Sequence, residues 1–302
     1  MPAFESTQQL THAQAIKLAR SHEPAIAWPT IVLVLVVALG FVGVAYAAAM
    51  QAMSSWFAFL LNVLLAYAAY TPVHEACHRN VVDAKHRLAW MNDAVGMLAA
   101  VPLLGGFHLH QLTHLAHHAH TNDPEKDPDH VMACKGGWAL IGLGLVLPFK
   151  HLVAGVQIAR TRSDGLRRQL IGWGQIALAL AGVVWLAITG DAVAAVICTV
   201  GSALTAGVML AFAFDWLPHH PHTSRERWEH TRVVTFSPLV QRIVDQLLLG
   251  QSYHLVHHLY PRVPYYRYKT VFNQLRGFFE SNGAQIYPAG QAAASAKPRS
   301  LD

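Results

Sequence analysis

The sequence is poor in charged residues. Asp, Glu, Lys and Arg make up 13% of its 302 residues, whereas hydrophobic residues make up 53%. Soluble globular domains carry about a quarter charged residues. Four windows contain no Asp, Glu, Lys, Arg or His, namely 27–50, 56–73, 170–189 and 192–214. Each is long enough to cross a hydrocarbon layer of about 30 Å, so the composition excludes an ordinary soluble protein and predicts a membrane protein.

Cysteine is scarce as well. The three cysteines, Cys77, Cys134 and Cys198, are odd in number and widely spaced, which makes a disulfide framework unexpected. The sequence has no glycine fingerprint for flavin or nicotinamide and no recognisable haem-binding segment. Any electrons that the protein uses therefore come from an external donor. The first apolar run is full span length, so no removable signal peptide is expected.

The four apolar windows predict an all-α membrane domain of two helical hairpins. Short connections at 50–55 and 190–191 place both termini and all long segments on one side, and all 22 Lys and Arg residues lie there. By the positive-inside rule that side is the cytoplasm, which predicts a multi-pass protein of the inner membrane. The net charge of +5 then reflects topology and anionic headgroups, and a nucleic-acid partner is not expected.

The remaining segments are expected to form one unit with these spans. Two shorter apolar stretches, 88–106 and 138–149, are interrupted by polar residues or too short to span, so they predict interfacial or re-entrant helices. The other segments on the cytoplasmic side predict a helical cap. Residues 1–282 are expected to be a single domain, and 283–302, rich in Ala, Gly, Ser and Pro, a flexible C-terminal tail.

Histidine, in contrast, is abundant, and most of the 20 histidines gather in four groups outside the apolar windows. The first group has the spacing HxxxH, which places both imidazoles on one face of a helix. Two groups share the spacing HxxHH, and another begins five residues after the last apolar window. In chain order the groups are His74 and His78; His114, His117 and His118; His219, His220 and His222; and His254, His257 and His258.

The four groups predict a site for two metal ions. The first and the 219–222 groups follow the second and fourth windows, so they emerge at one membrane depth, and the other two groups can fold beneath them. With His219 as the favoured member of its group, about nine neutral nitrogen donors result, too many for one tetrahedral zinc and suited to two metals of higher coordination number. Imidazole binds iron, copper, zinc and nickel, so the metal is not named by the pattern, although redox chemistry on the cytoplasmic side favours iron.

Other polar residues near these groups could support the site, and two of the cases below have a second interpretation. Asp215 stands four residues before His219 and either holds a ligand water or ends a helix. Glu75 is expected to accept a hydrogen bond from a ligand imidazole, and His120 and His222 are further candidate ligands. An acidic run supports the site in the same way or forms a solvated turn; it comprises Asp123, Glu125, Asp127 and Asp129.

The remaining histidines are expected to lie outside the site. Six are interpreted as solvated side chains: His12, His22, His86, His130, His151 and His230. His108 and His110 alternate instead of sharing the helix face of His114, so we expect structural or surface roles for them.

The histidine groups around four spans resemble those of the membrane fatty acid desaturase and hydroxylase superfamily. The strings HLAHHAHTNDPEKDPDH, FDWLPHHPHTSRERW and GQSYHLVHHLYPRVPYYRY look most like cyanobacterial-type β-carotene ring hydroxylases. The resemblance covers about 73–130 and 212–269. It implies two iron ions held by the following residues: His74, His78, His114, His117, His118, His219, His254, His257 and His258. It also matches Asp215 to a residue that approaches a metal through water in acyl-chain desaturases.

The resemblance further implies reductive O2 activation and attack on an unactivated C–H bond of a lipid-soluble substrate. Oxygen return gives an alcohol, as in β-carotene ring hydroxylation, whereas loss of a second hydrogen gives an alkene, as in a fatty acyl desaturase. We predict hydroxylation as the favoured reaction and desaturation as the alternative. The substrate is expected to enter from the bilayer through a tunnel lined by Phe59, Leu61 and Phe212.

A soluble acidic carrier such as ferredoxin is the expected electron donor. Arg162, Arg167 and Arg168 are candidate contacts for it, although a topogenic role explains them more simply.

Two other classes of function remain as distant alternatives. His74, Glu75 and His78 satisfy the HExxH pattern of a zinc protease, but that chemistry leaves the other histidine groups without a role. A metal transporter carries ionisable ligands within its spans, and the four windows have none.

Overall fold

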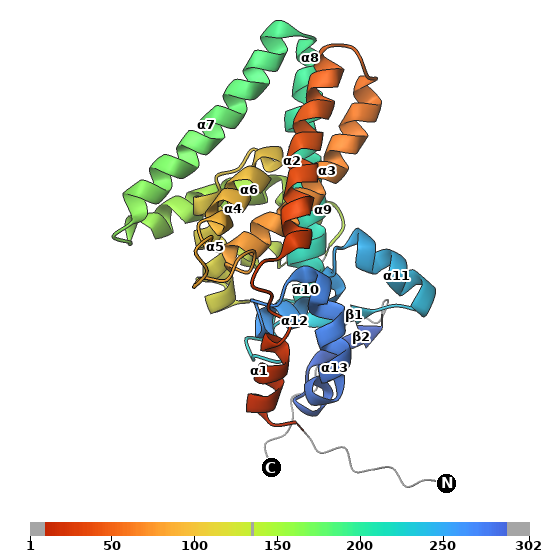
Figure 1. Ribbon diagram of the computed structural model, residues 1–302. Coiled ribbons are helices and arrows are strands. Elements are labelled where there is room, and N and C mark those ends of the chain that lie inside the picture. Colours follow the sequence, from red (N-terminus) through yellow and green to blue (C-terminus); the bar gives the residue numbers. More distant parts are fainter. Residues whose placement is uncertain (1–9, 134–135, 289–302) are drawn as a thin grey trace.

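The computed structural model describes residues 10–133 and 136–288. It has an elongated part of long helices and a cap of shorter elements at one end, as Figure 1 shows. The helices are α1 His12–Arg20, α2 Trp28–Ala49, α3 Ser55–Cys77, α4 Met91–Ala99, α5 Phe107–His120, α6 Trp138–Arg160, α7 Gly165–Thr189, α8 Ala192–Val196, α9 Ser202–Leu210, α10 Leu217–His219, α11 Pro238–Leu247, α12 His254–Leu259 and α13 Tyr268–Ser281. The strands are β1 Arg232–Thr235 and β2 Gln285–Pro288.

Two tight connections lie at the end of the molecule away from the cap (Figure 1). One joins α2 to α3, and the other joins α7 to a helix that runs from Ala192 to His219 through α8, α9 and α10. The backbone N–H of Asp191 donates to the carbonyl of Ala49 over 2.7 Å, so the two connections contact each other. Because the connections share one end, the opposite ends of α3 and α10 both reach the cap.

The number of span-length helices differs from the predicted four. Among the described residues, five helices are long and apolar enough to cross a membrane: α2, α3, α6, α7 and the helix 192–219. The interpretation of 138–149 as too short to span is wrong, because α6 continues for 23 residues to Arg160. The prediction stopped at 149 because Lys150 and His151 are ionisable. In the structure His151 donates to the buried carboxylate of Asp129 over 2.5 Å. The long stem of Lys150 carries its charge to the surface.

Helix α5, which carries the second histidine group, is fixed by close packing on α6 and α7. Leu109 on α5 is 1% exposed. A Cβ atom at Gly155 of α6 would lie 2.8 Å from the Leu109 carbonyl oxygen, and one at Gly172 of α7 would lie 2.9 Å from Leu109 Cγ. Only glycine permits both approaches, so these two positions set the depth and rotation of α5 beside the neighbouring helices.

The cap contains the one sheet of the described residues, which the all-α expectation did not include. Strands β1 and β2 pair in parallel with Arg232 opposite Gln285. Helices α1, α12 and α13 pack together around buried Leu255, Tyr268 and Phe279. Strand β2 occupies part of the segment expected to be a flexible tail, and the rest of that segment, 289–302, lies outside the described residues.

Candidate metal centre

The ends of four segments bring the histidine groups together where the long helices meet the cap. Helix α3 ends at Cys77, so His74 lies in its last turn and His78 directly follows it. The second group is on α5, and His219 ends α10. The last group, His254, His257 and His258, lies on α12. The HxxxH group and the two HxxHH groups keep the helical spacing that the sequence predicted, so the imidazoles of each project from one face. The structure places all nine predicted ligand histidines in one continuous cluster.

Within the cluster the imidazoles form two neighbouring groups. Ligand atoms of five residues lie within 4.8 Å of one another: His74, His78, His114, His118 and His257. A second set of ligand atoms meets the same limit: His117, His219 and His258. His254 joins the second group, because its Nε2 is 3.1 Å from Nε2 of His258. The rings of His118 and His258 are stacked at 4.2 Å, so the two groups are adjacent.

The distances between ring nitrogens fit shared metal ions. Nε2 of His78 lies 2.7 Å from Nε2 of His114, and Nε2 of His118 lies 2.8 Å from Nε2 of His257. Two imidazoles bound to one metal at about 2.1 Å and at right angles would have nitrogens about 3.0 Å apart. The observed separations are close to that value, so little movement is needed for each pair to bind one ion.

The outward-facing nitrogens of four imidazoles have hydrogen-bond partners from the cap and the connecting segments. The pairs are His117 Nδ1 with Asp127 Oδ1 at 2.9 Å, His254 Nδ1 with Gln251 Oε1 at 2.6 Å, His257 Nδ1 with Tyr268 Oη at 3.1 Å and His219 Nδ1 with the His230 carbonyl at 3.2 Å. An acceptor at Nδ1 fixes the proton there and leaves the Nε2 lone pair for a metal. The partners therefore aim all four Nε2 atoms into the cluster.

Glu75 supports the cluster through an intermediary. Its Oε1 accepts from the backbone N–H of Tyr265 over 3.2 Å, and the side chains of Asn80 and Tyr268 lie beside the carboxylate. Tyr268, which is fully buried, in turn contacts His257. Glu75 therefore acts on the ligand His257 through the Tyr268 hydroxyl instead of by direct contact. The histidine spacing did not reveal Tyr268 as a partner, because Tyr268 lies on α13 and not on α12 with His257.

The acidic run divides between the two roles that the sequence left open. Asp127 and Asp129 are each 7% exposed, and their carboxylates lie 2.9 and 3.3 Å from His117 Nδ1. Glu125 is exposed, and Asp123 caps the turn that contains it. Burial lowers the pKa of His117, but Asp129 and Asp127 outweigh burial and raise the pKa to about 9. Metal binding at His117 therefore displaces a proton.

Five other imidazoles, on α5 and α12, are held neutral. Burial, followed by repulsion between neighbouring imidazolium charges, lowers the pKa well below its usual value in five residues: His114, His118, His254, His257 and His258. The buried Nε2 atoms of His74 and His219 have no hydrogen-bond partner. Neutral imidazoles and orphaned buried nitrogens are what a metal ion would satisfy, so the residues present fit two ions of the type that imidazole binds.

Several other predicted residues lie beside the cluster. His120 is exposed at the end of α5. His222 is buried, but its ring is 6.1 Å from that of His219, and His222 belongs to neither group. His230 was interpreted as a solvated side chain, yet its carbonyl supports His219 and its ring lies 5.1 Å from that of His258. His151 was interpreted in the same way and is instead bonded to Asp129.

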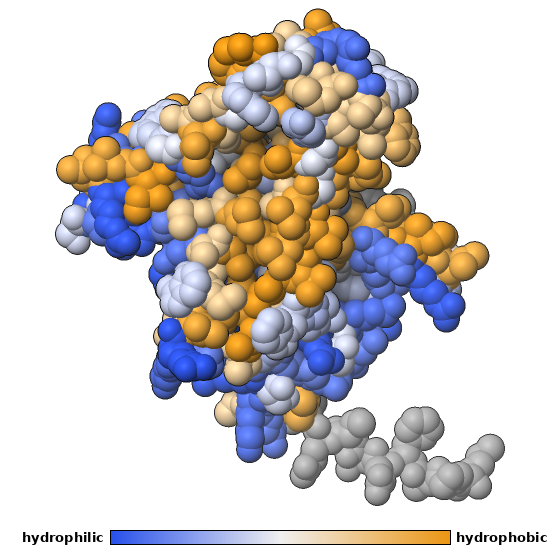
Figure 2. Space-filling view, turned by 45° about the horizontal axis from the view of Figure 1, so that its top comes forward, coloured by the Kyte–Doolittle hydropathy of each residue, from blue (hydrophilic) through white to orange (hydrophobic). Residues whose placement is uncertain are grey.

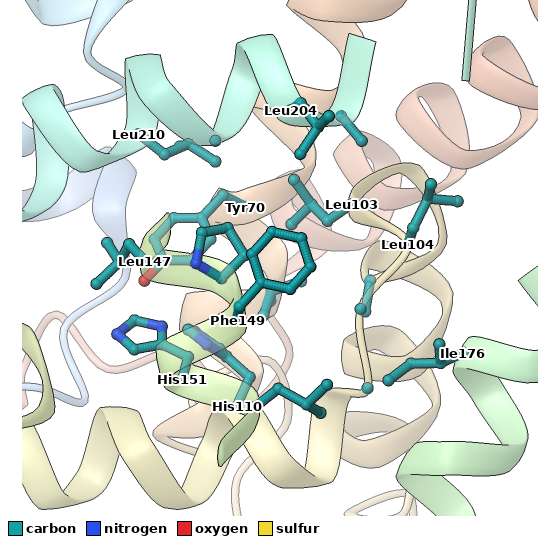
Figure 3. A pocket seen from close by; sticks show the side chains of 18 of the residues that line it. Tyr70, Leu103, Leu104, His110, Leu147, Phe149, His151, Ile176, Leu204 and Leu210 are labelled. Atoms are coloured by element: carbon teal, nitrogen blue, oxygen red, sulfur yellow. The ribbon is translucent and has the colours of Figure 1, made fainter. Parts of the chain in front are cut away.

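An apolar cavity of about 370 Å³ adjoins the cluster (Figure 3). Apolar residues from several elements line most of it, including Leu103, Leu147 and Leu204. Its polar lining consists mainly of Tyr70, His110, His151 and Asp215. The Tyr70 ring lies 6.0 Å from that of His74, and the His110 ring lies 6.0 Å from that of His114, so this polar lining borders the histidine cluster. Asp215 therefore lies at the cavity and not among the clustered ligand atoms.

The predicted tunnel residues do not line this cavity. Phe59 packs against Trp56 with ring centroids 5.5 Å apart, Phe212 is 41% exposed, and Leu61 is partly buried elsewhere on α3. The tunnel through these residues stays a prediction, because these helices are apolar on all sides and their sequence does not reveal which side faces the interior.

Two comparisons with known proteins match this chain. The model of the fatty acid desaturase family matches residues 53–289. Over 106 residues the chain is 33% identical to the sn-1 oleoyl-lipid 12-desaturase of Synechocystis sp.. That alignment covers 33% of this chain and 27% of the relative, so the chain matches about a quarter of the length of that protein.

Proposed function

The chain belongs to the fatty acid desaturase family, and from that premise we propose that it is a membrane oxidoreductase for a lipid-soluble substrate. In this proposal the histidine cluster would hold two iron ions, which would supply the chemistry for oxidising a C–H bond with O2 and external electrons. The observation that carries it is the cluster of nine imidazoles beside an apolar cavity. We place the centre and both termini on the cytoplasmic side of the inner membrane, where a ferredoxin-type carrier would deliver electrons.

The protein residues have separate tasks in this scheme. Bound iron would supply the activation of O2 and the removal of hydrogen from carbon. The leucines of the cavity exclude water and hold an apolar chain or ring, as expected of a site for a lipid-soluble molecule. Tyr70 and His110 border the metal-binding residues, so the part of the substrate beside them is the part that reacts.

Two substrate classes share this chemistry. The motif strings favour hydroxylation of a β-carotene ring, and we propose this reaction first. The identity with a Synechocystis lipid desaturase favours the second candidate, insertion of a double bond into an acyl chain. Both reactions use the same ligands, so the position of the substrate in the cavity decides between them. An HExxH protease site would use His74, His78 and one further ligand, whereas seven other imidazoles join this pair.

Expression of the chain in a bacterium that makes β-carotene tests the proposal. Pigments and membrane acyl chains are analysed by mass spectrometry, and metals are measured in the purified protein. Hydroxylated carotenoids with about two irons per chain support the first candidate, and new unsaturated acyl chains with the same metal content support the second. One zinc per chain without iron would overturn the iron-based oxidation in both forms.

A cavity-filling substitution tests the assignment of the substrate site. Gly207 lines the cavity, and a Cβ atom there would be 3.7 Å from Pro148, so alanine fits while a larger side chain extends into the open space. We expect Gly207→Leu to lower the rate of substrate oxidation by about tenfold or more, because it removes volume that apolar contacts of the substrate would fill. Iron content should not change.

Two controls accompany this substitution. Gly207→Ala should retain most of the activity, and Gly182→Leu adds the same side chain on the exposed side of α7, where a Cβ meets nothing within 4 Å. Product formation is measured at equal amounts of folded protein. Full activity of Gly207→Leu would show that the substrate occupies another place.

A further inference from the structure

Helix α11 has an apolar face that the rest of the described chain leaves uncovered. Leu239, Ile243 and Leu247 are 71%, 53% and 63% exposed. Residues four apart lie on one side of a helix, so the three side chains form a single stripe. Such a stripe on an exposed ten-residue helix needs an apolar partner, because a soluble surface rarely carries a continuous apolar patch without one.

The opposite face of α11 is fixed to the cap by hydrogen bonds and an ion pair. Asp245 accepts from Gln241 at 2.5 Å and from Ser252 at 2.9 Å, and it pairs with Lys269 at 2.8 Å. Gln241 is buried and also accepts from the backbone N–H of Phe236. These contacts fix the rotation of α11, so its apolar stripe points away from the cap for a structural reason.

The position of α11 identifies the partner as the bilayer. Leu248, directly after the helix, packs against the core cluster between the long helices that includes Tyr67 and Phe214. The helix therefore ends at the level at which the spans enter the cap. Figure 2 shows apolar side chains on the arm formed by α11 on its side toward the spans, and hydrophilic side chains on the side away from them. The apolar stripe is thus continuous in level and direction with the apolar surface of the spans.

We propose that α11 lies in the headgroup layer of the membrane, on the side that carries the histidine cluster, with its apolar stripe among the acyl chains. An amphipathic helix with its polar face outward binds a membrane surface in this way. Arg242 is exposed on α11 and Lys269 is half-exposed beside it, so anionic phospholipids are the favoured lipid class. The proposal requires only that the chain spans a membrane and does not depend on iron chemistry.

A site-specific fluorescent label tests this placement in the full-length chain. Ile243→Cys is made together with Cys134→Ser, while Cys77 and Cys198 are buried and remain. The new cysteine carries a polarity-sensitive nitrobenzoxadiazole label, and the protein is placed in nanodiscs of phosphatidylcholine and phosphatidylglycerol. Lipids with a spin label near the headgroup are expected to quench the fluorescence several-fold more than at Glu280→Cys, an exposed position on α13. Without added cysteine, the Cys134→Ser parent gives the background labelling.

Three results would overturn the proposal. A label at position 243 that reports water and is not quenched by lipid would show that the stripe stays in solvent. An apolar but unquenched label that depends on protein-to-nanodisc ratio would identify a second copy as the partner. An apolar, unquenched label that becomes lipid-quenched when 289–302 are deleted would identify the C-terminal segment as the partner.

Discussion

Replacing His118 by alanine is expected to remove iron from the centre and abolish substrate oxidation. Nε2 of His118 lies 2.8 Å from Nε2 of His257, and its ring stacks on that of His258 at 4.2 Å, so it stands where the two imidazole groups meet. Loss of a residue that only hydrogen-bonds to a metal ligand already costs about 10- to 100-fold in metal affinity or activity. Loss of this imidazole should cost more than that, and iron per chain should fall clearly below two.

The same helix supplies a matched control. His120 is two residues later, also near the end of α5, but it is exposed and outside both imidazole groups. His120→Ala should therefore keep the iron content and activity of the unmodified chain. Iron is measured by mass spectrometry on purified protein, and product formation is measured in membranes. Retention of two irons by His118→Ala would contradict the ligand assignment.

Asp127→Asn is expected to lower iron affinity by about 10- to 100-fold while leaving the chain folded. The Asp127 carboxylate accepts from His117 Nδ1 at 2.9 Å and from the backbone N–H of Asn122 at 2.7 Å. An amide has one acceptor oxygen, so one of these donors must face an NH2 group. When the NH2 group faces His117, this imidazole loses the Asp127 acceptor that fixes its tautomer. His117 then binds the metal less well.

Affinity in this variant is measured as the chelator concentration that removes half of the iron. Glu125→Gln is the control, because it makes the same chemical change at an exposed position of the same acidic run. Near-ultraviolet circular dichroism of the metal-free proteins checks that packing is unchanged. Equal chelator resistance of Asp127→Asn and the control would show that the carboxylate is not needed to orient His117.

The site was predictable to the extent that it depends on helical repeat. The HxxxH and HxxHH spacings placed each group of imidazoles on one face before any packing was known, and their convergence follows from hairpins whose ends share one level. Tyr268 and Gln251 were not predicted as partners of His257 and His254. Gln251 stands three residues before His254, a spacing that was available in the sequence, whereas Tyr268 is brought to His257 by the packing of α13 on α12.

The errors in the fold have a common physical cause. The predicted helix stopped before Lys150, whereas α6 continues to Arg160. The prediction treated each ionisable residue as exposed to lipid. In the structure His151 meets a carboxylate from another segment, which removes most of that penalty. The expected tunnel residues Phe59 and Phe212 do not line the cavity, and the sequence could not show this because rotation about a uniformly apolar helix has no signature in it.

Composition and spacing by themselves determined that this is a membrane protein with nine clustered imidazole donors, since apolar length and helical repeat are properties of single segments. Tertiary structure alone decided how the nine divide into two groups, which carboxylates orient His117, and where the apolar cavity meets His74 and His114. Those features depend on the depth and rotation of one helix against another. Close contacts such as that between Gly155 and Leu109 fix both quantities, and no single segment contains them.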